Sequence, residues 1–350
     1  MLEKVFRLKE NGTNARTEII AGITTFMTMA YILAVNPSVL ADAGMDQGAG
    51  FTATALAALI GTLLMAFCAN YPFALAPGMG LNAYFAYTVV LGMGYRWEVA
   101  LTAVFIEGII FIVLSLTNVR EAIFNAIPQN LKAAVSVGIG LFIAFIGLQN
   151  AKIVIGGSTL LQLFSVEGYN EVNGVEASFQ DAGITVLLAV IGILITGFLV
   201  IKNVKGNILW GILITWILGI ICQFTGLYVP NPELGFYGLL PDFSSGFSIP
   251  SLSPIFAKLE FSGIFSLEFL VVIFAFLFVD MFDTIGTLIG VSSKANMLDE
   301  NGRLTNIRGA LLADAIATTA GAVLGPSTTT TFVESDSGVS EVGRTGLTAV

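Results

Sequence analysis

The chain has 350 residues, of which 55% are hydrophobic and only 11% are charged, with a mean hydropathy of +0.87. A soluble domain carries roughly 25% charged residues, so this composition excludes a water-soluble globular protein and predicts a surface that mostly faces lipid. The formal net charge is −9 and no basic stripe is interleaved with aromatic residues, which argues against nucleic acid as a partner.

The chain begins with a charged segment, residues 1–16, which we interpret as a cytoplasmic lead-in helix because no cleavage site follows it. A membrane-spanning helix needs about 20 largely apolar residues. Two of the candidate spans, the third and the tenth, are short and interrupted by Gly and Pro or rich in Thr and Ser. The sequence predicts ten spans, near residues 17–35, 51–69, 75–91, 97–116, 131–149, 182–201, 206–226, 266–290, 307–324 and 326–344.

The distribution of basic residues tests this count. With the N-terminus in the cytoplasm, all of the 15 Lys and Arg residues except Arg96, Lys152 and Lys258 fall on the inner side, as the positive-inside rule requires. Leaving out the third span inverts the later loops and removes the bias, so the pattern indicates a crossing there. Two long connections, 150–181 and 227–262, then lie outside; we expect solvated loops, the second with room for a short interfacial helix near Ile255–Leu259.

Two segments, Tyr71–Tyr84 and Gly325–Ser335, break the helical pattern in the same way. Each has a Pro, then an extended stretch, then a polar residue that opens a helix. Each is the third crossing of its half if the second half starts at the eighth span. Corresponding broken helices indicate a transporter's substrate site; two kinked helices without a ligand are the alternative. Because β-branched residues favour extended backbone, we expect Thr328–Thr331 and Phe73–Ala76 to pair as short strands.

The eighth span carries two acids, Asp280 and Asp283, which are three residues apart and therefore share a helix face. A charge at mid-span costs at least ~2.5–3.5 kcal/mol. A water-filled site with proton or cation traffic would explain this; a helix end at the cytoplasmic interface is the alternative, since Lys294 follows. The chain has no His, so proton chemistry must use carboxylates.

Other acids lie in or near the predicted spans. Glu334 lies where the Thr-rich stretch becomes helical, and we expect it to contact a ligand, whereas Asp336 would cap the half-helix. Glu107 and Asp314 are interpreted as structural, Asp314 through a hydrogen bond from its helix to a neighbour.

Four stretches resemble the nucleobase:cation symporter-2 superfamily, in its azaguanine-resistance branch of adenine, guanine and hypoxanthine permeases. They are Gly22–Ile32, Ala76–Ala83, Asp280–Thr287 and Thr328–Gly338. The resemblance implies an all-α polytopic membrane protein with two inverted repeats of seven helices, core and gate domains, and short β-strands in broken helices 3 and 10. It assigns residues 17–116 and 263–350 to the two halves of the core, 117–226 to the first half of the gate, and 227–262 to an extracytoplasmic loop. Ten of fourteen helices are accounted for before Val350, so a truncated chain or one unable to transport alone is expected.

The resemblance also implies a function, which is not enzymatic: secondary active import of purine nucleobases by proton symport across the cell membrane, without a cofactor. Sodium as the coupling ion, a homodimer, and another small solute (uracil, xanthine or an inorganic anion) stay open. We expect Glu334 and Asn82 to contact the base, and Asp280, assisted by Asp283, to carry the proton. The predicted site residues are Asn82, Asp280, Glu334 and Ser335 for substrate, Asp280 and Asp283 for the proton, and Gly78, Gly80, Thr330 and Thr331 for half-helix and strand backbone.

Overall fold

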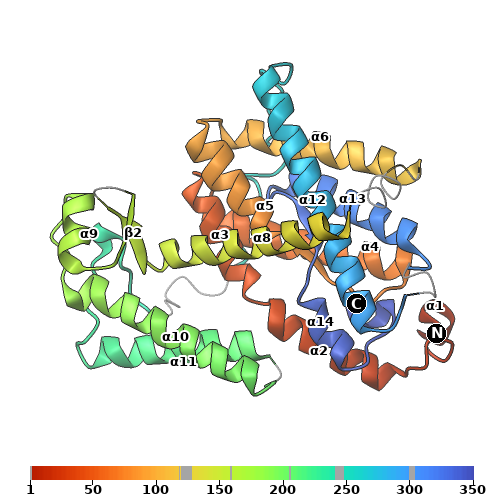
Figure 1. Cartoon of the computed structure of the whole chain (residues 1–350), viewed down its shortest axis with the longest axis horizontal. Helices are drawn as coiled ribbons and strands as arrows, with labels where there is room; N and C mark the ends of the chain where they lie inside the picture. Colours follow the sequence, from red (N-terminus) through yellow and green to blue (C-terminus); the bar gives the residue numbers. More distant parts are fainter. Residues whose placement is uncertain are drawn as a thin grey trace. The chain divides into compact units, whose positions relative to one another are not determined.

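The computed structural model describes residues 2–117, 119, 128–157, 160–204, 206–240, 248–298 and 304–350 (Figure 1). The chain divides into two compact units, one of residues 1–140 and 249–350 and the other of residues 141–248. Arg120, Lys205 and Arg303, counted above on the inner side, lie outside the described residues, as does the 241–247 part of the second long connection. The division into core and gate halves stays a prediction.

The first unit is built from helices and two short strands. Its elements are α1 Leu2–Phe6, α2 Ala15–Met29, α3 Ile32–Asp42, α4 Gln47–Leu64, the π-helix η1 Met65–Ala69, β1 Leu75–Pro77, α5 Met79–Ala83, the π-helix η2 Tyr84–Gly92, α6 Trp97–Leu116, the start of α8 Gln129–Asn150, α12 Leu267–Lys294, α13 Ile307–Leu324, β4 Thr329–Thr331, α14 Ser335–Ser340 and α15 Gly346–Ala349.

Seven helical stretches among the described residues are long and apolar enough to cross a membrane. They correspond to seven of the ten predicted spans, and α8 corresponds to an eighth. The first span is longer than predicted, because after a turn at Ala30 and Tyr31 the chain continues as α3 to Asp42. Pro37 lies inside α3 without ending it, although Pro removes one helical hydrogen bond. The remaining two predicted spans are the broken segments.

The broken segments meet as a two-stranded antiparallel ladder, as predicted. β1 pairs with β4 in the register Leu75↔Thr331, Ala76↔Thr330 and Pro77↔Thr329. The pairing lies slightly later in the first segment than expected, with Pro77 in the strand. It is extended at both ends, by the Phe332 N–H donating to the Ala74 carbonyl (2.9 Å) and the Gly78 N–H donating to the Thr328 carbonyl (3.0 Å).

Polar side chains from the flanking helices satisfy the outer edges of this ladder. On the β1 side, the Thr62 hydroxyl of α4 bonds both the N–H and the carbonyl of Leu75, at 2.9 and 3.1 Å. On the β4 side, the Thr318 hydroxyl of α13 donates to the Thr329 carbonyl (2.9 Å). Irregular backbone at membrane depth needs such internal partners. Two strands are therefore enough here, because α4 and α13 act as their neighbours.

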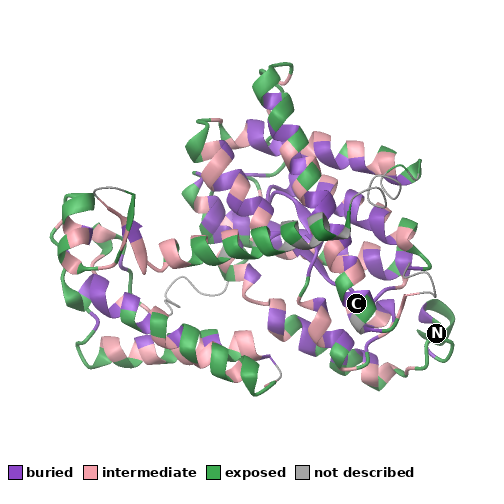
Figure 2. Ribbon diagram, viewed as in Figure 1, coloured by how far each residue is buried: buried purple, intermediate pink, exposed green. Residues whose placement is uncertain are grey.

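Glycines allow these helices to approach the strands closely. A Cβ on Gly321 of α13 would lie 2.4 Å from the Thr329 hydroxyl oxygen and 2.6 Å from the Ser327 carbonyl oxygen. Figure 2 colours the chain by burial; all residues of β1 and β4 are buried, as are many of α6 and α13. The ladder consequently lies inside the unit rather than at its edge.

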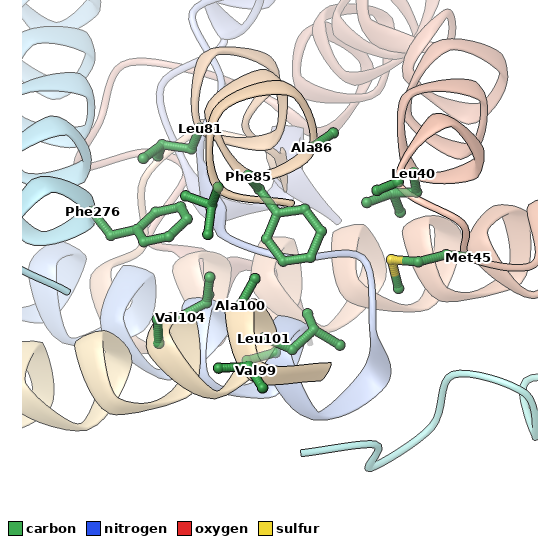
Figure 3. Close-up of a cluster of buried hydrophobic side chains, with 14 of the residues drawn as sticks. Leu40, Met45, Leu81, Phe85, Ala86, Val99, Ala100, Leu101, Val104 and Phe276 are labelled. Atoms are coloured by element: carbon green, nitrogen blue, oxygen red, sulfur yellow. The ribbon is translucent and has the colours of Figure 1, made fainter. Parts of the chain in front are cut away.

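The half-helix that follows β1, α5 with η2, is held by apolar packing. Leu81, Phe85 and Ala86 are buried in one cluster with side chains from three other helices (Figure 3). The labelled members from those helices are Leu40 of α3, Val99, Ala100, Leu101 and Val104 of α6, and Phe276 of α12. This packing fixes the half-helix against α12, the helix that carries Asp280.

The second unit consists of the end of α8, strands β2 Val154–Gly156 and β3 Leu161–Leu163, α9 Val166–Asn173, the π-helix η3 Phe179–Gly183, α10 Ile184–Ile201, α11 Asn207–Phe224 and the 3-10 turn η4 Pro232–Leu234. β2 and β3 pair antiparallel. The exposed faces of α10 and α11 carry large apolar side chains, among them Leu194, Phe198 and Phe224. Such faces are suited to lipid.

The structure corrects the description of both long connections as solvated loops. Residues 150–181 hold the β2–β3 pair and α9, which begins at the capping side chain of Ser165 and ends at Gly174 in the left-handed conformation. In the second connection, the predicted interfacial helix near Ile255 is a series of turns. Ile255 is buried in the core of the first unit, and the Ala257 N–H donates to the Val323 carbonyl at 2.7 Å.

Candidate functional site

Asp280 and Asp283 lie on one face of α12, inside its membrane-spanning stretch Leu267–Ser293. Asp280 is fully buried, and Asp283 is half-buried. Because α12 continues beyond both residues to Lys294, these acids do not lie at a helix end. The interpretation of Asp280 as an interfacial residue is therefore wrong, and its burial needs another explanation.

The hydroxyl of Thr284, one turn after Asp280, connects α12 to two other elements. Its oxygen lies 3.2 Å from Oδ1 of Asp280, 2.9 Å from Oδ2 of Asp314 on α13, and 2.7 Å from the hydroxyl of Thr330 on β4. All four side chains are buried. One hydroxyl thus joins two carboxyl groups and the strand.

Asp314 anchors β4 through its other oxygen. Oδ1 accepts the N–H of Thr331 (3.1 Å) and the hydroxyls of Thr330 and Thr331 (3.3 Å each). The prediction that Asp314 links its helix to a neighbour is confirmed, and the neighbours are β4 and α12. A carboxyl group in this place supplies an acceptor for a strand edge that lipid could not satisfy.

Gly78 sits at the contact between β4, the start of α5 and α12. It is the N-cap residue of α5. A Cβ at this position would lie 2.7 Å from Cγ2 of Thr330 and 3.8 Å from Oδ2 of Asp283. The N-terminus of the half-helix, which carries partial positive charge, therefore lies next to the Asp283 carboxyl. This is a favourable position for negative charge. Gly80 lies inside α5, where its carbonyl accepts the N–H of Tyr84.

Glu334 is the N-cap residue of α14 and is half-buried. The hydroxyl of Tyr31, at the turn between α2 and α3, donates to its Oε1 at 2.6 Å. The next residue, Ser335, is fully buried, and its hydroxyl oxygen accepts the N–H of Ala74 (3.0 Å). Ser335 thus ties α14 to the segment before β1, and Tyr31 sets the position of the Glu334 carboxyl.

Asn82 belongs to a separate polar network. Its amide nitrogen donates to Oδ1 of Asn36 (2.6 Å) and to the Pro326 carbonyl (3.3 Å), and Asn36 donates in turn to the Thr54 hydroxyl (2.9 Å). Oδ1 of Asn82 is buried without a hydrogen-bond partner among the described residues. In this arrangement Asn82 has an acceptor, but no donor, left for a ligand.

Three other acids lie near the carboxyl of Asp283. Asp280, Asp314 and Glu334 each lie close enough to Asp283 for their negative charge to act on its carboxyl. The predicted residues Gly78, Thr330 and Thr331 belong to the same cluster. The roles assigned to these residues in binding and proton transfer stay predictions.

Sequence reasoning missed three polar contacts. Thr284 was recognised only as part of a motif, although a residue four positions after Asp280 shares its helix face. Tyr31 belongs to the Gly22–Ile32 stretch, and no pattern in the sequence assigns a partner to its hydroxyl. Glu18 is a fully buried acid of α2 that receives the N–H groups of Arg344 and Thr345. An acid inside the first predicted span was a signal for it.

Comparison with known proteins places this arrangement in a family. The profile of the Permease family matches residues 16–350. Guanine/hypoxanthine permease PbuO of Bacillus subtilis (strain 168) is 44% identical over 348 residues, which are 99% of this chain and 74% of PbuO. Adenine permease AdeP of Escherichia coli (strain K12) is 39% identical over 351 residues, which are 100% of this chain and 72% of AdeP.

The fold also occurs in a solved structure. The transmembrane domain of the cyanobacterial bicarbonate transporter BicA superposes with a TM-score of 0.62 at 18% identity, covering 95% of this chain and 78% of that domain. At this identity the likeness concerns the fold alone, and it confirms the predicted fold class. With its spans, its paired broken helices and these relatives, the chain is a multi-pass membrane transporter, not an enzyme, and it belongs to the permease family of the nucleobase:cation symporter-2 superfamily.

Proposed function

We propose that the protein imports purine nucleobases (guanine, hypoxanthine or adenine) across the cell membrane by proton symport. The observation that carries the proposal is the cluster of four acids beside the strands and half-helices of the two broken segments. Relatives of 44% and 39% identity are named for guanine/hypoxanthine and for adenine. A site rich in carboxyl groups suits a neutral base with N–H donors better than an inorganic anion.

Glu334 is our choice for the residue that recognises the base. A purine presents neighbouring donors and acceptors along a planar edge, and a carboxylate accepts two hydrogen bonds. Tyr31 occupies Oε1 of Glu334, which orients Oε2 for a purine N–H. The hydroxyl hydrogen of Ser335 and Oδ1 of Asn82 are further groups that could face the base, since the bonds described above use the other atoms of these side chains.

Asp280, assisted by Asp283, is proposed as the proton carrier. Asp280 is fully buried and shares one face of α12 with Asp283. A carboxyl that is protonated at the acidic outer face and releases its proton inside would couple substrate import to the pH gradient. The proposal includes a cytoplasmic N-terminus, supported by the distribution of Lys and Arg; Na⁺ coupling and a homodimer are its open alternatives.

Uptake into proteoliposomes tests this function. Purified protein is reconstituted, and uptake of labelled guanine, hypoxanthine and adenine is measured with an inward pH gradient, with an inward Na⁺ gradient, and with a protonophore. We expect purine accumulation that follows the pH gradient and disappears with the protonophore. Uptake that follows Na⁺ alone would reject proton coupling, and uptake of bicarbonate or uracil in place of purines would reject the substrate class.

Two variants test the assignment of Glu334 in the same vesicles. Glu334→Gln removes one acceptor from the proposed base contact, whereas Asp336→Asn makes the same chemical change two residues further along α14. We expect Glu334→Gln to weaken purine binding by about tenfold or more, the effect of losing a hydrogen bond to a charged group, and Asp336→Asn to bind much as the wild type does. Equal affinities of the two variants would refute the assignment.

A further inference from the structure

The contacts of the Thr284 hydroxyl require more hydrogens than one hydroxyl carries. Its oxygen is within hydrogen-bond distance of Oδ1 of Asp280 (3.2 Å), Oδ2 of Asp314 (2.9 Å) and Oγ1 of Thr330 (2.7 Å). A hydroxyl has one hydrogen to donate, and an ionised carboxylate can only accept. When both acids are ionised, Thr284 can donate its hydrogen to only one of them. The contact between Thr284 and the other carboxylate then contains no hydrogen.

The hydroxyl of Thr330 does not resolve this shortage. It has one hydrogen of its own, and it lies within reach of Thr284 (2.7 Å) and of Oδ1 of Asp314 (3.3 Å). Whether the Thr330 hydroxyl donates to Thr284 or to Asp314, the contact between Thr284 and one carboxyl oxygen still has no hydrogen. When a single proton is added to one of the two acids, Thr284 forms a hydrogen bond with each carboxyl group, and the hydroxyl of Thr330 donates either to Thr284 or to Oδ1 of Asp314.

Protonated Asp280 gives a consistent chain. The Asp280 carboxyl then donates to the Thr284 oxygen, and the Thr284 hydroxyl donates to Oδ2 of Asp314. Oδ1 of Asp314 keeps the N–H of Thr331 and the hydroxyls of the strand. The three side chains lie on α12 and α13, and both helices contact β4. The proton state of Asp280 thus decides the direction of the hydrogen bond that reaches the anchor of β4.

We propose that Asp280 and Asp314 share one proton through the hydroxyl of Thr284, which makes Thr284 the relay residue and Asp314 the second proton site of the transporter. This rests on the proton coupling proposed above. In the transfer step, the Asp280 proton moves to the Thr284 oxygen while the hydroxyl proton of Thr284 moves to Oδ2 of Asp314. Two protons shift, so the net result is the transfer of one proton from Asp280 to Asp314, and Thr284 remains a neutral hydroxyl.

Three other acids lie on α12 or next to elements that pack against it. Asp283 lies on the same face of α12, Glu334 precedes α14, and Glu107 is fully buried on α6, the helix packed against both α12 and α13. Each added negative charge favours keeping one proton in the group. Because Asp314 also holds β4, a shift of the proton towards it weakens the acceptor that anchors the strand. Proton release is thereby linked to the ladder between the two broken segments.

Three variants separate the relay from a packing role. Thr284→Val keeps the shape of the side chain and removes the hydroxyl, whereas Thr284→Ser keeps the hydroxyl. Thr319→Val is the matched control, because within the described part of the chain the Thr319 hydroxyl of α13 bonds its own helix, at the Ala315 carbonyl (2.9 Å). Each variant is reconstituted, and purine counterflow at equal pH is compared with uptake driven by an inward pH gradient.

We expect Thr284→Val to retain counterflow, and its pH-driven uptake to fall by about a hundredfold, the lower end of what a positioned proton-transfer group contributes. Thr284→Ser should restore the pH-driven uptake, and Thr319→Val should keep it. Equal pH-driven uptake by Thr284→Val and Thr319→Val would overturn the relay. If the wild type itself ignores the pH gradient, the coupling proposed for the protein is wrong, which is a different result.

A spectroscopic measurement keeps the proposal testable if Thr284→Val is poorly folded. Infrared difference spectra on purine binding should contain a protonated-carboxyl band that disappears in Asp280→Asn. This band should shift in Asp314→Asn, because the chain of hydrogen bonds then ends on an amide. An unshifted Asp280 band in folded Asp314→Asn protein would show that the two acids do not share a proton, and would overturn the inference.

Discussion

Tyr31 and Glu334, separated by most of the sequence, are joined by a 2.6 Å hydrogen bond from the tyrosine hydroxyl to Oε1 of the glutamate. Tyr31 lies in the turn between α2 and α3, and Glu334 is the N-cap residue of α14. The hydroxyl of Thr28, one turn earlier on α2, lies 3.4 Å from the Glu334 carbonyl oxygen. The end of α2 and the turn after it thereby position an acid of the second broken segment.

Tyr31→Phe should therefore weaken purine binding without unfolding the protein. The ring stays in place, but Oε1 of Glu334 loses its donor, and the carboxylate is free to turn away from the substrate. Hydrogen bonds to charged groups contribute about 1.5–3 kcal/mol, so we expect the KM for purine to rise by about tenfold or more. Tyr71→Phe is the matched control, because that hydroxyl accepts the Asn306 N–H (2.9 Å), away from the acid cluster. Equal KM values for the two variants would contradict the positioning role.

Gly78 provides a prediction about the contact between the two broken segments. Gly78→Ala places a methyl group 2.7 Å from Cγ2 of Thr330, and such overpacking costs about 1–3 kcal/mol. We expect a lower thermal midpoint and reduced uptake. Adding Thr330→Ser removes Cγ2 and keeps the hydroxyl, so the double variant should recover much of both. Gly290→Ala, where a Cβ meets open space, is the control; failure of the double variant to recover would show that the methyl contact is not the cause.

Glu18 should matter for stability. It is fully buried, and its carboxylate accepts the N–H groups of Arg344 and Thr345 and the hydroxyls of Thr345 and Thr348. Glu18→Ala leaves these donors buried without a partner, which costs about 1–3 kcal/mol or more. Thermal unfolding in detergent should show a clear loss for Glu18→Ala and little change for Glu10→Ala, an exposed residue 3.9 Å from Arg7. Similar midpoints for the two would mean that the cluster around Glu18 contributes no stability.

The predicted topology can be measured by labelling single cysteines. Ser178 and Ser293 are exposed at the ends of different spans, and the charge pattern predicts that they face opposite sides of the membrane. Cys68 and Cys222 are first replaced by Ser, and Ser178→Cys or Ser293→Cys is then introduced. A membrane-impermeant thiol reagent should label the residue at 178 from outside and the residue at 293 only after permeabilisation. Labelling of both from one side would reject the topology.

The ladder between the broken segments could be predicted because its causes are local. A run of four threonines favours extended backbone, and Pro77 and Pro326 disfavour a continuous helix. The identity of the residues that bond across helices could not be predicted in the same way. A threonine in a helix usually bonds its own backbone, as Thr24 does with the Ile20 carbonyl (2.9 Å). The spacing from Asp280 places Thr284 on the same helix face, but it does not predict the partners of Thr284 on α13 and β4.

The pairing of β2 with β3 has a signal in the sequence that the prediction of a solvated loop did not use. Val154 and Ile155 precede two glycines, and Leu161 and Leu163 alternate with Gln162, which is a pattern typical of a hairpin. The acidic composition of residues 150–181 favours a solvated loop instead, which is the structure predicted from the sequence. By contrast, the burial of Ile255 depends on packing against the distant core of the first unit. A Pro-rich connection gives no periodic signal for such a contact.

The proton role of Asp280 has a direct test in Asp280→Asn. The amide imitates a protonated carboxyl, because its N–H can donate to the Thr284 oxygen, and it cannot release a proton. Substrate and proton should each tighten the binding of the other, because coupling between two ligands is reciprocal. We therefore expect Asp280→Asn to bind and exchange purine, with an affinity that no longer depends on pH, and to lose the accumulation driven by a pH gradient.

The direction of the pH effect follows from the same reasoning. In the wild type, acid outside favours the protonated, substrate-binding form, so uptake should rise as the outer pH falls. Asp280→Asn imitates this form permanently, so the inward half of the cycle can occur. The empty transporter must return in the deprotonated form, which the variant cannot adopt. Counterflow therefore continues while net uptake stops. If Asp280→Asn still concentrates purine against its gradient, another group carries the proton, and Asp283 on the same face of α12 is the next residue to replace.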